Sequence, residues 1–209
     1  MSVEPAHLLA IAAALGWASG LRLYAVLFLV GLAGHLGWIP MTPGLSVLST
    51  PLVLGATGLM LVVEFFADKL PGIDSVWDTI HTVIRIPAGA ALAASVLGGD
   101  NATWTLIAGL MGGTLAATSH VAKATTRAAV NTSPEPFSNI GLSLLGDAAV
   151  PGMLWLAWEM PFWFFVALAI AVVGALVVTY VLFRFLRGIV RGVFDRAGQS
   201  AGATEEGGA

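Results

Sequence analysis

Residues 64–85 read EFFADKLPGIDSVWDTIHTVIR, and this stretch concentrates charge in a chain that otherwise avoids it. If a helix begins at Asp74, the polar side chains recur at intervals of four, three and four residues. Such intervals place side chains on one face of a helix and leave the other faces apolar. The polar face consists of Asp74, Asp78, His81 and Arg85. The stretch therefore predicts an apolar helix that carries one polar stripe.

The composition around this stretch is that of a membrane protein. Of the 209 residues, 57% are hydrophobic and 10% are charged, and the mean hydropathy is +0.89. An ordinary soluble domain has about a quarter charged residues. Several apolar runs reach the roughly 20 residues needed to cross the hydrocarbon core of a bilayer. We predict an all-α, polytopic transmembrane helix bundle with spans at residues 6–37, 45–67, 75–97, 103–130, 138–157 and 161–188.

The predicted bundle is one domain over residues 1–190, and residues 191–209 form an interfacial and then disordered cytoplasmic tail. Lys and Arg are absent from the connections near residues 38–44, 98–102 and 158–161, and they cluster at the other side of the bundle. The positive-inside rule then places both termini in the cytoplasm, in a bacterial inner membrane.

Two pairs of glycines suggest close helix packing. Gly16 and Gly20 in the first span, and Gly109 and Gly113 in the fourth, have the four-residue spacing that lets membrane helices approach each other. Their positions suggest a 3+3 inverted repeat, a common plan among transporters. The same faces make a homo-oligomer plausible.

The fourth span has a polar face that complements the third. It consists of His120, Lys123, Arg127 and Asn131. Because neighbouring spans run antiparallel, residues of similar depth should meet. The expected pairs are Asp74 with Arg127 or Asn131, Asp78 with Lys123 or Arg127, and His81 with His120. Such pairs either hold the bundle together or mark a site for an ion, because intramembrane charges are costly unless paired.

Acidic residues in the cytoplasmic half are candidates for a cation site. Carboxylates suit hard divalent ions such as Mg²⁺, Ca²⁺ or Mn²⁺. The candidate ligands are Glu64, Asp68, Asp74, Asp78 and His81, with Glu135 as a further carboxylate. Asp147, near the midplane of the fifth span, and His120 are candidate proton carriers, although Asp147 could instead pair with Arg22 or Arg85. Asp68 and Lys69 alternatively form a solvated pair in a loop.

Basic residues offer a site of the opposite sign. Arg22, Arg85, Lys123 and Arg127 could bind an anion or a lipid phosphate. The connection NTSPEPFSN adds the polar side chains Asn131, Ser133, Glu135 and Asn139. No cysteine occurs, and no hydrolase or nucleotide-binding motif is found, so catalytic residues are not predicted. The small net charge of −3 and the lack of a basic aromatic patch exclude nucleic acid as a partner.

Three phrases resemble a family of bacterial integral membrane proteins, with relatives in plants, known as domain of unknown function 4126. They are ASGLRLYAVLFLVGLAGHLG, VEFFADKLPGIDSVWDTIHTVIRIPAGA and KATTRAAVNTSPEPFSNIGLSL, the last two containing EFFADKLPGIDSVWD and NTSPEPFSN. This resemblance implies no activity. A looser similarity links Glu64-Phe-Phe-Ala-Asp68-Lys69 to the acidic E-x-G-D-K motif of small manganese and calcium exchangers, from which it departs by one inserted residue and the missing glycine.

These observations lead to three hypotheses. The first is a small ion transporter or channel-like protein with an acidic cation and proton site, which implies a divalent cation as its only candidate cofactor. The second is a membrane enzyme or transporter that acts on a phosphate or lipid-phosphate group through the Arg and Lys stripe. The third is a non-catalytic membrane scaffold whose charges are structural. In each case the lipid bilayer is the surrounding medium, and in the first two a small ion or solute is the partner.

Overall fold

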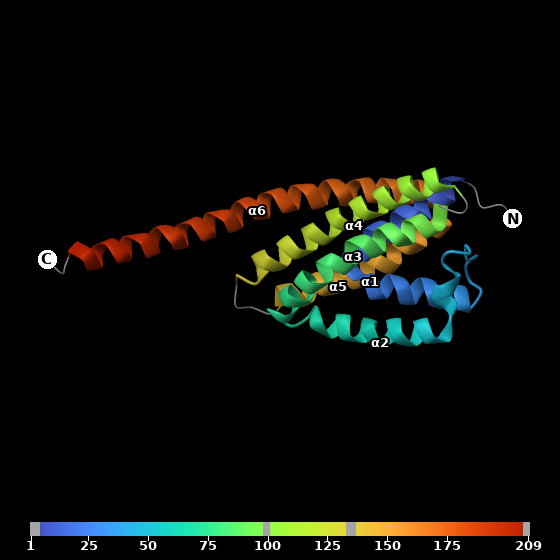
Figure 1. Cartoon of the computed structure of the whole chain (residues 1–209), viewed down its shortest axis with the longest axis horizontal. Helices are drawn as coiled ribbons and strands as arrows, with labels where there is room; N and C mark the ends of the chain where they lie inside the picture. Colours follow the sequence, from blue (N-terminus) through green and yellow to red (C-terminus); the bar gives the residue numbers. More distant parts are fainter. Residues whose placement is uncertain (1–4, 98–100, 133–136, 207–209) are drawn as a thin grey trace.

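The computed structural model describes residues 5–97, 101–132 and 137–206, with side chains described up to residue 188 and at Arg191. In these ranges the chain is helical and has no strand, so the predicted all-α class is confirmed (Figure 1). The predicted spans coincide with the helices except that the second begins later, after a short 3₁₀ turn, η1 (Ser46–Ser49). The helices are α1 (Pro5–His35), α2 (Pro51–Ala67), α3 (Ile73–Leu97), α4 (Ala102–Val130), α5 (Phe137–Glu159) and α6 (Pro161–Glu206).

Helix α1 is not a single span, because it folds back on itself at Arg22. The backbone of Arg22 has φ −147° and ψ 84°, which lies outside the helical region. This residue divides α1 into a first arm, residues 5–21, and a second arm, residues 23–35. The two arms pack on different helices, and their neighbours establish the direction in which each arm runs.

The first arm runs in the same direction as α4. A Cβ atom added to Gly16 would meet Gly112, and one added to Gly20 would meet Ala116. From the first pair to the second, the residue number rises by four in both helices, so the two helices run in the same direction. The approach is so close that a Cβ added to Gly20 would collide with the Ala116 carbonyl oxygen. Small residues therefore allow the first arm into the centre of the bundle.

The second arm runs against α2. Phe28 contacts Gly58, and Gly31 lies against Leu54. The residue number therefore rises along α1 as it falls along α2, which is the pattern of antiparallel helices. Since α2 and α4 run in the same direction (Figure 1), the two arms of α1 are antiparallel. The start and the end of α1 accordingly lie at the same end of the bundle, where Leu8 and the chain just after α1, at Met41, line one small cavity.

This course changes the predicted topology. By length and composition, α1, α3, α4, α5 and α6 could each cross a membrane, and α2, with 17 residues, is shorter. Because α1 returns to the end from which it started, it is the five helices α2 to α6 that each run from one end of the described bundle to the other (Figure 1). The first described residue and the end of α6 lie at opposite ends of the molecule (Figure 1). The prediction that both termini lie in the cytoplasm assumed that α1 runs through the bundle once, which is not the course that α1 takes, and the side of each terminus stays a prediction.

Two other predictions meet a different structure. Helix α6 projects beyond the bundle and continues to Glu206, so the segment expected to be disordered is largely helical (Figure 1). The inverted repeat stays a prediction, and the folded-back course of α1 differs from the straight course of its supposed counterpart α4. Of the two glycine pairs, the first makes the tight contacts, whereas Gly112 rather than Gly109 or Gly113 is the point of closest approach on α4.

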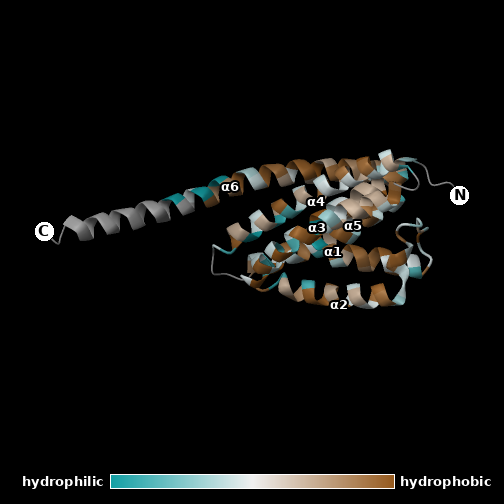
Figure 2. Ribbon diagram, in the orientation of Figure 1, coloured by the Kyte–Doolittle hydropathy of each residue, from teal (hydrophilic) through white to brown (hydrophobic). Residues whose placement is uncertain are grey.

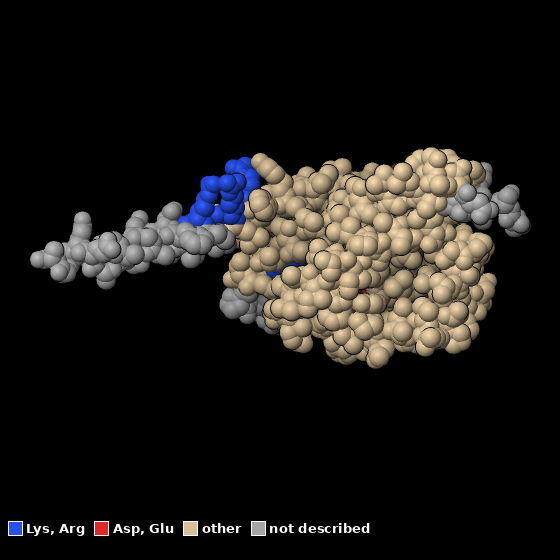
Figure 3. All heavy atoms as spheres, in the orientation of Figure 1, with Lys and Arg blue, Asp and Glu red and all other residues tan. Residues whose placement is uncertain are grey.

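The outer surface is apolar, and the charges lie inside. Figure 2 shows hydrophobic residues along the outward side of α2 and along the part of α6 that packs on the bundle. In the view of Figure 3, the surface of the bundle shows almost no charged atoms, and the prominent basic patch lies where α6 leaves the bundle. Seven charged side chains are nevertheless buried among the described residues, namely Arg22, Glu64, Asp68, Asp74, Asp78, Arg85 and Arg127. The protein is therefore a multi-pass membrane protein with a charged interior.

Candidate functional site

A continuous series of ion pairs runs through the interior and joins α1, α2, α3, α4 and α5. We call it the ion-pair chain. Its members, in order of contact, are Glu64, Arg85, Asp78, Lys123, Asp68, Arg22, Asp147 and Lys69. Acidic and basic residues alternate along it, so the chain contains equal numbers of opposite formal charges. It lies close to the point where α1 reverses direction.

The inner end of the chain is organised by Arg85 of α3. Its Nη2 donates to Oε1 of Glu64 over 2.8 Å, and its Nη1 donates to Oδ1 of Asp78 over 2.6 Å. All three side chains are almost completely buried. The interval between Asp78 and Arg85 is seven residues, or about two helical turns, which places both on the same face of α3.

Lys123 of α4 occupies the middle of the chain. Its Nζ lies 3.0 Å from Oδ1 of Asp78 and 2.8 Å from Oδ2 of Asp68. The same ammonium donates to the carbonyl oxygen of Leu21 over 3.1 Å. Because the helix is interrupted at Arg22, a side chain of α4 thus satisfies a carbonyl group at the break. One lysine therefore links the polar face of α3, the end of α2 and the reversal in α1.

The outer end of the chain passes through the break itself. Arg22 Nη2 lies 3.2 Å from Oδ2 of Asp68 and 2.9 Å from Oδ1 of Asp147, and it donates to Oγ of Ser143 over 2.8 Å. Lys69 Nζ then pairs with the other carboxylate oxygen of Asp147 over 3.1 Å. The side chains of Asp147 and Lys69 are 23% and 19% exposed. The chain therefore leads from a fully buried carboxylate to a partly accessible ion pair.

Not every polar atom in the ion-pair chain has a hydrogen-bond partner. Among the described residues, Nη1 of Arg22, Nε of Arg85, Oε2 of Glu64 and Oδ2 of Asp78 are buried without a hydrogen bond. A buried charged group with an unsatisfied donor or acceptor is costly, so such atoms mark places where water or a solute can bind. In Arg22 the free donor belongs to the residue at which α1 breaks.

A cavity of about 340 Å³ adjoins the middle and outer parts of the chain. Its polar lining consists of Trp17, Arg22, Asp68, Lys123, Thr126, Arg127 and Ser143. The rest of its wall is made of aliphatic residues and glycines from the first arm of α1 and from α4, α5 and α6. Three cationic side chains and one carboxylate thus face a largely apolar space.

A second polar cluster ties together the ends of three helices. Arg127 Nη1 lies 3.4 Å from Oδ2 of Asp74 and donates to Oδ1 of Asn139 over 2.8 Å. The Asn131 amide donates to Oδ1 of Asp74 over 2.9 Å, and the same oxygen accepts the backbone N–H of Gly72. These contacts join the start of α3, the end of α4 and the start of α5. Their geometry is that of a structural clamp.

The pairs predicted from equal depth in the membrane form between the charged residues but not between the two histidines. Asp74 contacts Arg127 and Asn131, and Asp78 contacts Lys123, as predicted. His81 and His120, however, have separate partners. We also find that Asp68 and Lys69 are not a solvated pair, because Asp68 is completely buried between Arg22 and Lys123. Asp147 has Arg22 as its partner, which was one of the two alternatives.

Each histidine has hydrogen-bonding neighbours of its own. His81 Nδ1 donates to the Trp77 carbonyl over 2.8 Å and stacks on the Trp77 ring, and its Nε2 faces the Tyr24 hydroxyl at 3.3 Å. His120 Nε2 lies 2.7 Å from Oγ1 of Thr82, while its Nδ1 faces Arg85. Aromatic stacking at an interval of four residues and hydroxyl contacts explain why the histidines lie apart.

The acidic residues do not gather around one point. Among the described residues, no group of three or more His, Asp or Glu side chains has the geometry to hold a metal ion. Glu64, Asp68 and Asp78 are each bound to Arg or Lys, and Asp74 belongs to the separate clamp. The candidates Ser133 and Glu135 lie outside the described residues. The geometry therefore does not bring the proposed cation ligands together.

Several important residues were not singled out by the sequence. Lys69 completes the ion-pair chain, and Ser143 accepts from Arg22 Nη2 and lies 3.2 Å from Lys69 Nζ. Trp17 lines the cavity, and its indole N–H has no partner among the described residues. A serine in an apolar span has little pattern of its own, and Trp17 resembles an ordinary interfacial tryptophan. The adjacent charges in Phe-Ala-Asp68-Lys69 were the one available signal, because both lie at the end of an apolar helix.

Comparison with known proteins gives a family but no activity. The family model described as Domain of unknown function (DUF4126) matches residues 9–181. The chain belongs to this family. The match covers the whole ion-pair chain and the cavity, as well as the break in α1, and it confirms the resemblance found in the sequence. No curated protein and no solved structure matches the chain.

Proposed function

We propose that this protein is a small membrane transporter for an anion, with its solute site beside the break in α1. The observation that carries the proposal is the break itself, which places Arg22 in a buried ion-pair chain and against a cavity. A polar backbone at membrane depth is tolerated only where it is buried in protein or lines a water-filled space. Broken membrane helices form the solute sites of many transporters.

The charge around the cavity favours an anion. Arg22, Lys123 and Arg127 line it, and Asp68 is the one carboxylate on its wall. Asp68 already interacts with two of these cations. A bound anion could accept from the free Nη1 of Arg22, whereas a cation would have to displace existing ion pairs. This reasoning favours the second sequence hypothesis over an acidic cation site.

The ion-pair chain provides a physical means of coupling solute binding to a change of shape. Each carboxylate in its middle is shared between two cations, so an incoming anion that attracts Arg22 weakens the contacts of Arg22 with Asp68 and Asp147. Lys69 can retain Asp147 when Arg22 moves, because it contacts the other carboxylate oxygen. Asp147 and Lys69 are the accessible end of the chain and the proposed place of proton exchange.

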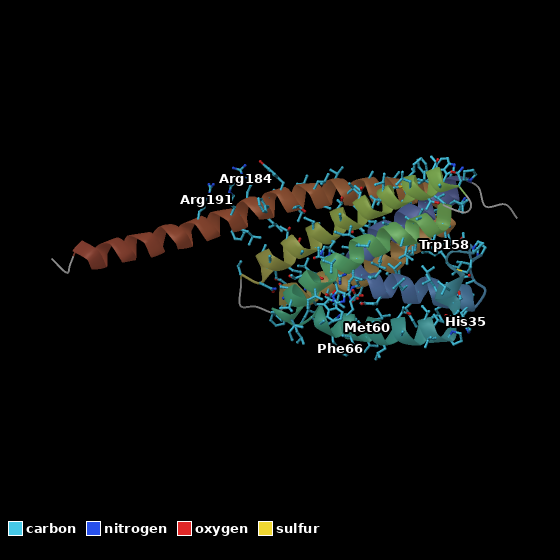
Figure 4. All side chains as sticks on the ribbon, viewed as in Figure 1. His35, Met60, Phe66, Trp158, Arg184 and Arg191 are labelled. Carbon is cyan, nitrogen blue, oxygen red and sulfur yellow. The ribbon has the colours of Figure 1, made fainter. Side chains whose placement is uncertain are left out.

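The distribution of Lys and Arg supports one orientation. The end of the bundle that carries Lys69, Arg127 and Arg184 would face the cytoplasm of a bacterial inner membrane, because the opposite connections contain neither Lys nor Arg. In Figure 4, Arg184 and Arg191 lie on the projecting part of α6, and His35 and Trp158 lie at the other end. With an odd number of crossings, the C-terminus would then be cytoplasmic and the N-terminus would lie outside.

Electrical recording from proteoliposomes on a solid-supported membrane tests the proposal. Concentration jumps of inorganic phosphate, sulfate and octyl phosphate should produce currents with the wild type, and jumps of Ca²⁺ or Mn²⁺ should not. The Asp147→Asn variant should reduce the anion current at least tenfold, since it removes a partner of Arg22. The matched control is Arg184→Gln, which changes an exposed residue that is not part of the ion-pair chain.

Two results would overturn the proposal. Currents with Ca²⁺ or Mn²⁺ but with no anion would restore the cation-site hypothesis. Silence towards every ion, from protein that retains its helical circular dichroism, would favour the scaffold hypothesis. A normal anion current in Asp147→Asn would separate transport from the ion-pair chain.

A further inference from the structure

The cavity has the lining of a site for an amphiphile rather than for a bare ion. Arg22, Lys123 and Arg127 supply positive charge at one part of the wall. The remainder is aliphatic and belongs mainly to α5 and α6. A small hydrated anion gains nothing from an apolar wall, whereas an alkyl chain does.

Helix α6 creates the apolar part of this space with small side chains. Ala171, Gly174, Ala175 and Val178 follow each other at intervals of three, one and three residues and line the cavity together. A Cβ atom added to Gly174 would have no atom within 4 Å. The helix is otherwise rich in Val, Leu and Phe, so the space results from small residues on this face.

The cavity opens towards the lipid. Leu145 of α5 and Val178 of α6 both line it, and they are 66% and 40% exposed on the outside of the bundle. Helices α4 and α5 contact each other little, and α6 packs across both. A ligand could therefore enter from the bilayer between α5 and α6 without crossing the packed centre formed by α1, α3 and α4.

Two residues of the polar part of the wall each have a buried donor without a partner among the described residues. The donors are Nη1 of Arg22 and the indole N–H of Trp17, both from the turn region of α1. Each side chain is more than nine-tenths buried, and each lines the cavity. Free donors beside a guanidinium and an ammonium fit the oxygen atoms of a carboxylate or a phosphate.

We propose that this cavity binds a single-chain amphiphile with an anionic headgroup, the headgroup at Arg22 and Trp17 and the alkyl chain along α5 and α6. The volume of about 340 Å³ is at the lower end of the range of small-molecule pockets, which suits one chain. The inference names the solute class of the proposed transporter. That the ligand is transported rests on the proposed function, whereas its binding in the cavity does not.

Contact quenching of tryptophan fluorescence in nanodiscs tests the binding. The probes are 2-bromododecyl phosphate, 2-bromododecanoate and the uncharged 2-bromododecanol, because bromine quenches indole at short range and must lie next to the headgroup to reach Trp17. We expect saturable quenching by an anionic probe, with at least tenfold weaker quenching by the alcohol. The comparison of phosphate with carboxylate shows which headgroup the site prefers. The Trp17→Phe variant should lose the saturable component, which identifies the tryptophan that reports it.

A matched pair of variants tests the location. Gly174→Leu would fill the mouth of the cavity and should abolish saturable quenching. Gly152→Leu places the same side chain at an open position of α5 that does not line the cavity, and it should quench like the wild type. Neither variant changes a charge, so both should keep the fold.

The outcomes separate this inference from the proposed function. Equal quenching by the alcohol, or full quenching in Gly174→Leu, would overturn the amphiphile site. A change from dimer to monomer in Gly174→Leu, without any saturable quenching in the wild type, would assign the face to a second copy of the chain instead. Currents with inorganic phosphate but no probe binding would support the transporter and overturn the amphiphile. Binding without any current would support the amphiphile site and overturn the proposed transport.

Discussion

Helices α1 and α6 are both long and apolar, but they hold opposite places in the molecule. In the most apolar window of each helix, 72% of the residues of α1 are buried and only 6% of those of α6. The more hydrophobic of the two is α6. In a membrane the most apolar helix faces the lipid, because lipid accepts Leu, Val and Phe as readily as a protein core does.

In the centre of the bundle, close helix packing favours small side chains instead. The first arm of α1 is rich in Ala and Gly, and it touches α3 and α4 at backbone distance. A break in such a helix can be stabilised, since neighbouring side chains reach the freed carbonyl groups. Ser119 donates to the Trp17 carbonyl over 2.7 Å, as Lys123 does to that of Leu21. Helix α6 has no such neighbours along most of its length, and it runs without a break.

The arginines of the two helices differ in the same way. Arg22 is surrounded by Asp68, Asp147 and Ser143, whereas Arg184 is exposed and contacts the Tyr180 hydroxyl at 3.2 Å. Removing a partner from a buried ion pair costs about 3–5 kcal/mol, while an exposed pair contributes about 0–1 kcal/mol. The contrast between α1 and α6 can therefore be tested at the level of topology, ion pairs and packing.

The largest expected effect is all-or-none and concerns which ends of the two helices share a side. The chain has no cysteine, so single cysteines can be introduced for labelling with a membrane-impermeant maleimide in intact cells. Ala6→Cys and Trp38→Cys, at the ends of α1, should be labelled alike. Met160→Cys, just before α6, and Gly188→Cys, at the end of its apolar part, should be labelled oppositely. Opposite labelling at residues 6 and 38 would contradict the reversal at Arg22.

Loss of the central guanidinium of the ion-pair chain should have the next largest effect. In Arg85→Met, Glu64 and Asp78 lose a buried partner, and we expect the free energy of unfolding to fall by about 3–5 kcal/mol. Arg184→Met on α6 is the matched control and should change it by less than about 0.5 kcal/mol. Denaturant unfolding in detergent, followed by circular dichroism, measures both. Equal stability of the two variants would remove the distinction between inside and outside charges.

A single methyl group should distinguish the packing of the two helices. In Gly20→Ala the new Cβ would collide with the Ala116 carbonyl and with Ser119, so we expect a loss of about 1–3 kcal/mol. In Gly174→Ala on α6 the Cβ enters open space, and the higher helix propensity of alanine should stabilise by up to about 1 kcal/mol. The same unfolding measurement applies. A stabilised Gly20→Ala would show that the first arm is not in backbone contact with α4.

The smallest expected effect is on lipid attraction. Arg184 and Arg191 lie on the projecting part of α6 (Figure 4), and Arg187 lies between them in the sequence and is exposed. Each should contribute about 1 kcal/mol of attraction to anionic lipid. The Arg187→Gln variant should therefore reduce binding of a fluorescent anionic lipid in mixed micelles about fivefold, without changing unfolding. An unchanged affinity would make this segment a simple extension of the helix.

Much of this architecture could be predicted from residue patterns. The apolar runs indicated the helices, and the interval from Asp74 through Asp78 to Arg85 indicated the buried stripe on α3. The partners Lys123 and Arg127 followed from depth alone, because ionisable groups inside an apolar bundle must find opposite charges. These inferences depend on local spacing and on the cost of burying charge, which a sequence displays directly.

The reversal of α1 was beyond such reasoning. Hydropathy averaged over residues 5–35 describes one long apolar segment, and Arg22 alone does not show whether the chain continues or turns back. The choice depends on contacts with residues more than ninety positions away, such as Ser119, Lys123 and Ser143. It changes which helices run from end to end of the bundle, which ends of α1 lie together and where the cavity lies.

Residue patterns alone specify a membrane-embedded bundle of helices with a charged interior, because hydrophobicity and helical spacing are properties of neighbouring residues. The order of the charges, the pairing of each carboxylate with a cation and the cavity beside them are set by the fold. Those features arise when α1, α4, α5 and α6 are brought together, since ion pairs and cavities depend on distances between residues far apart in the chain.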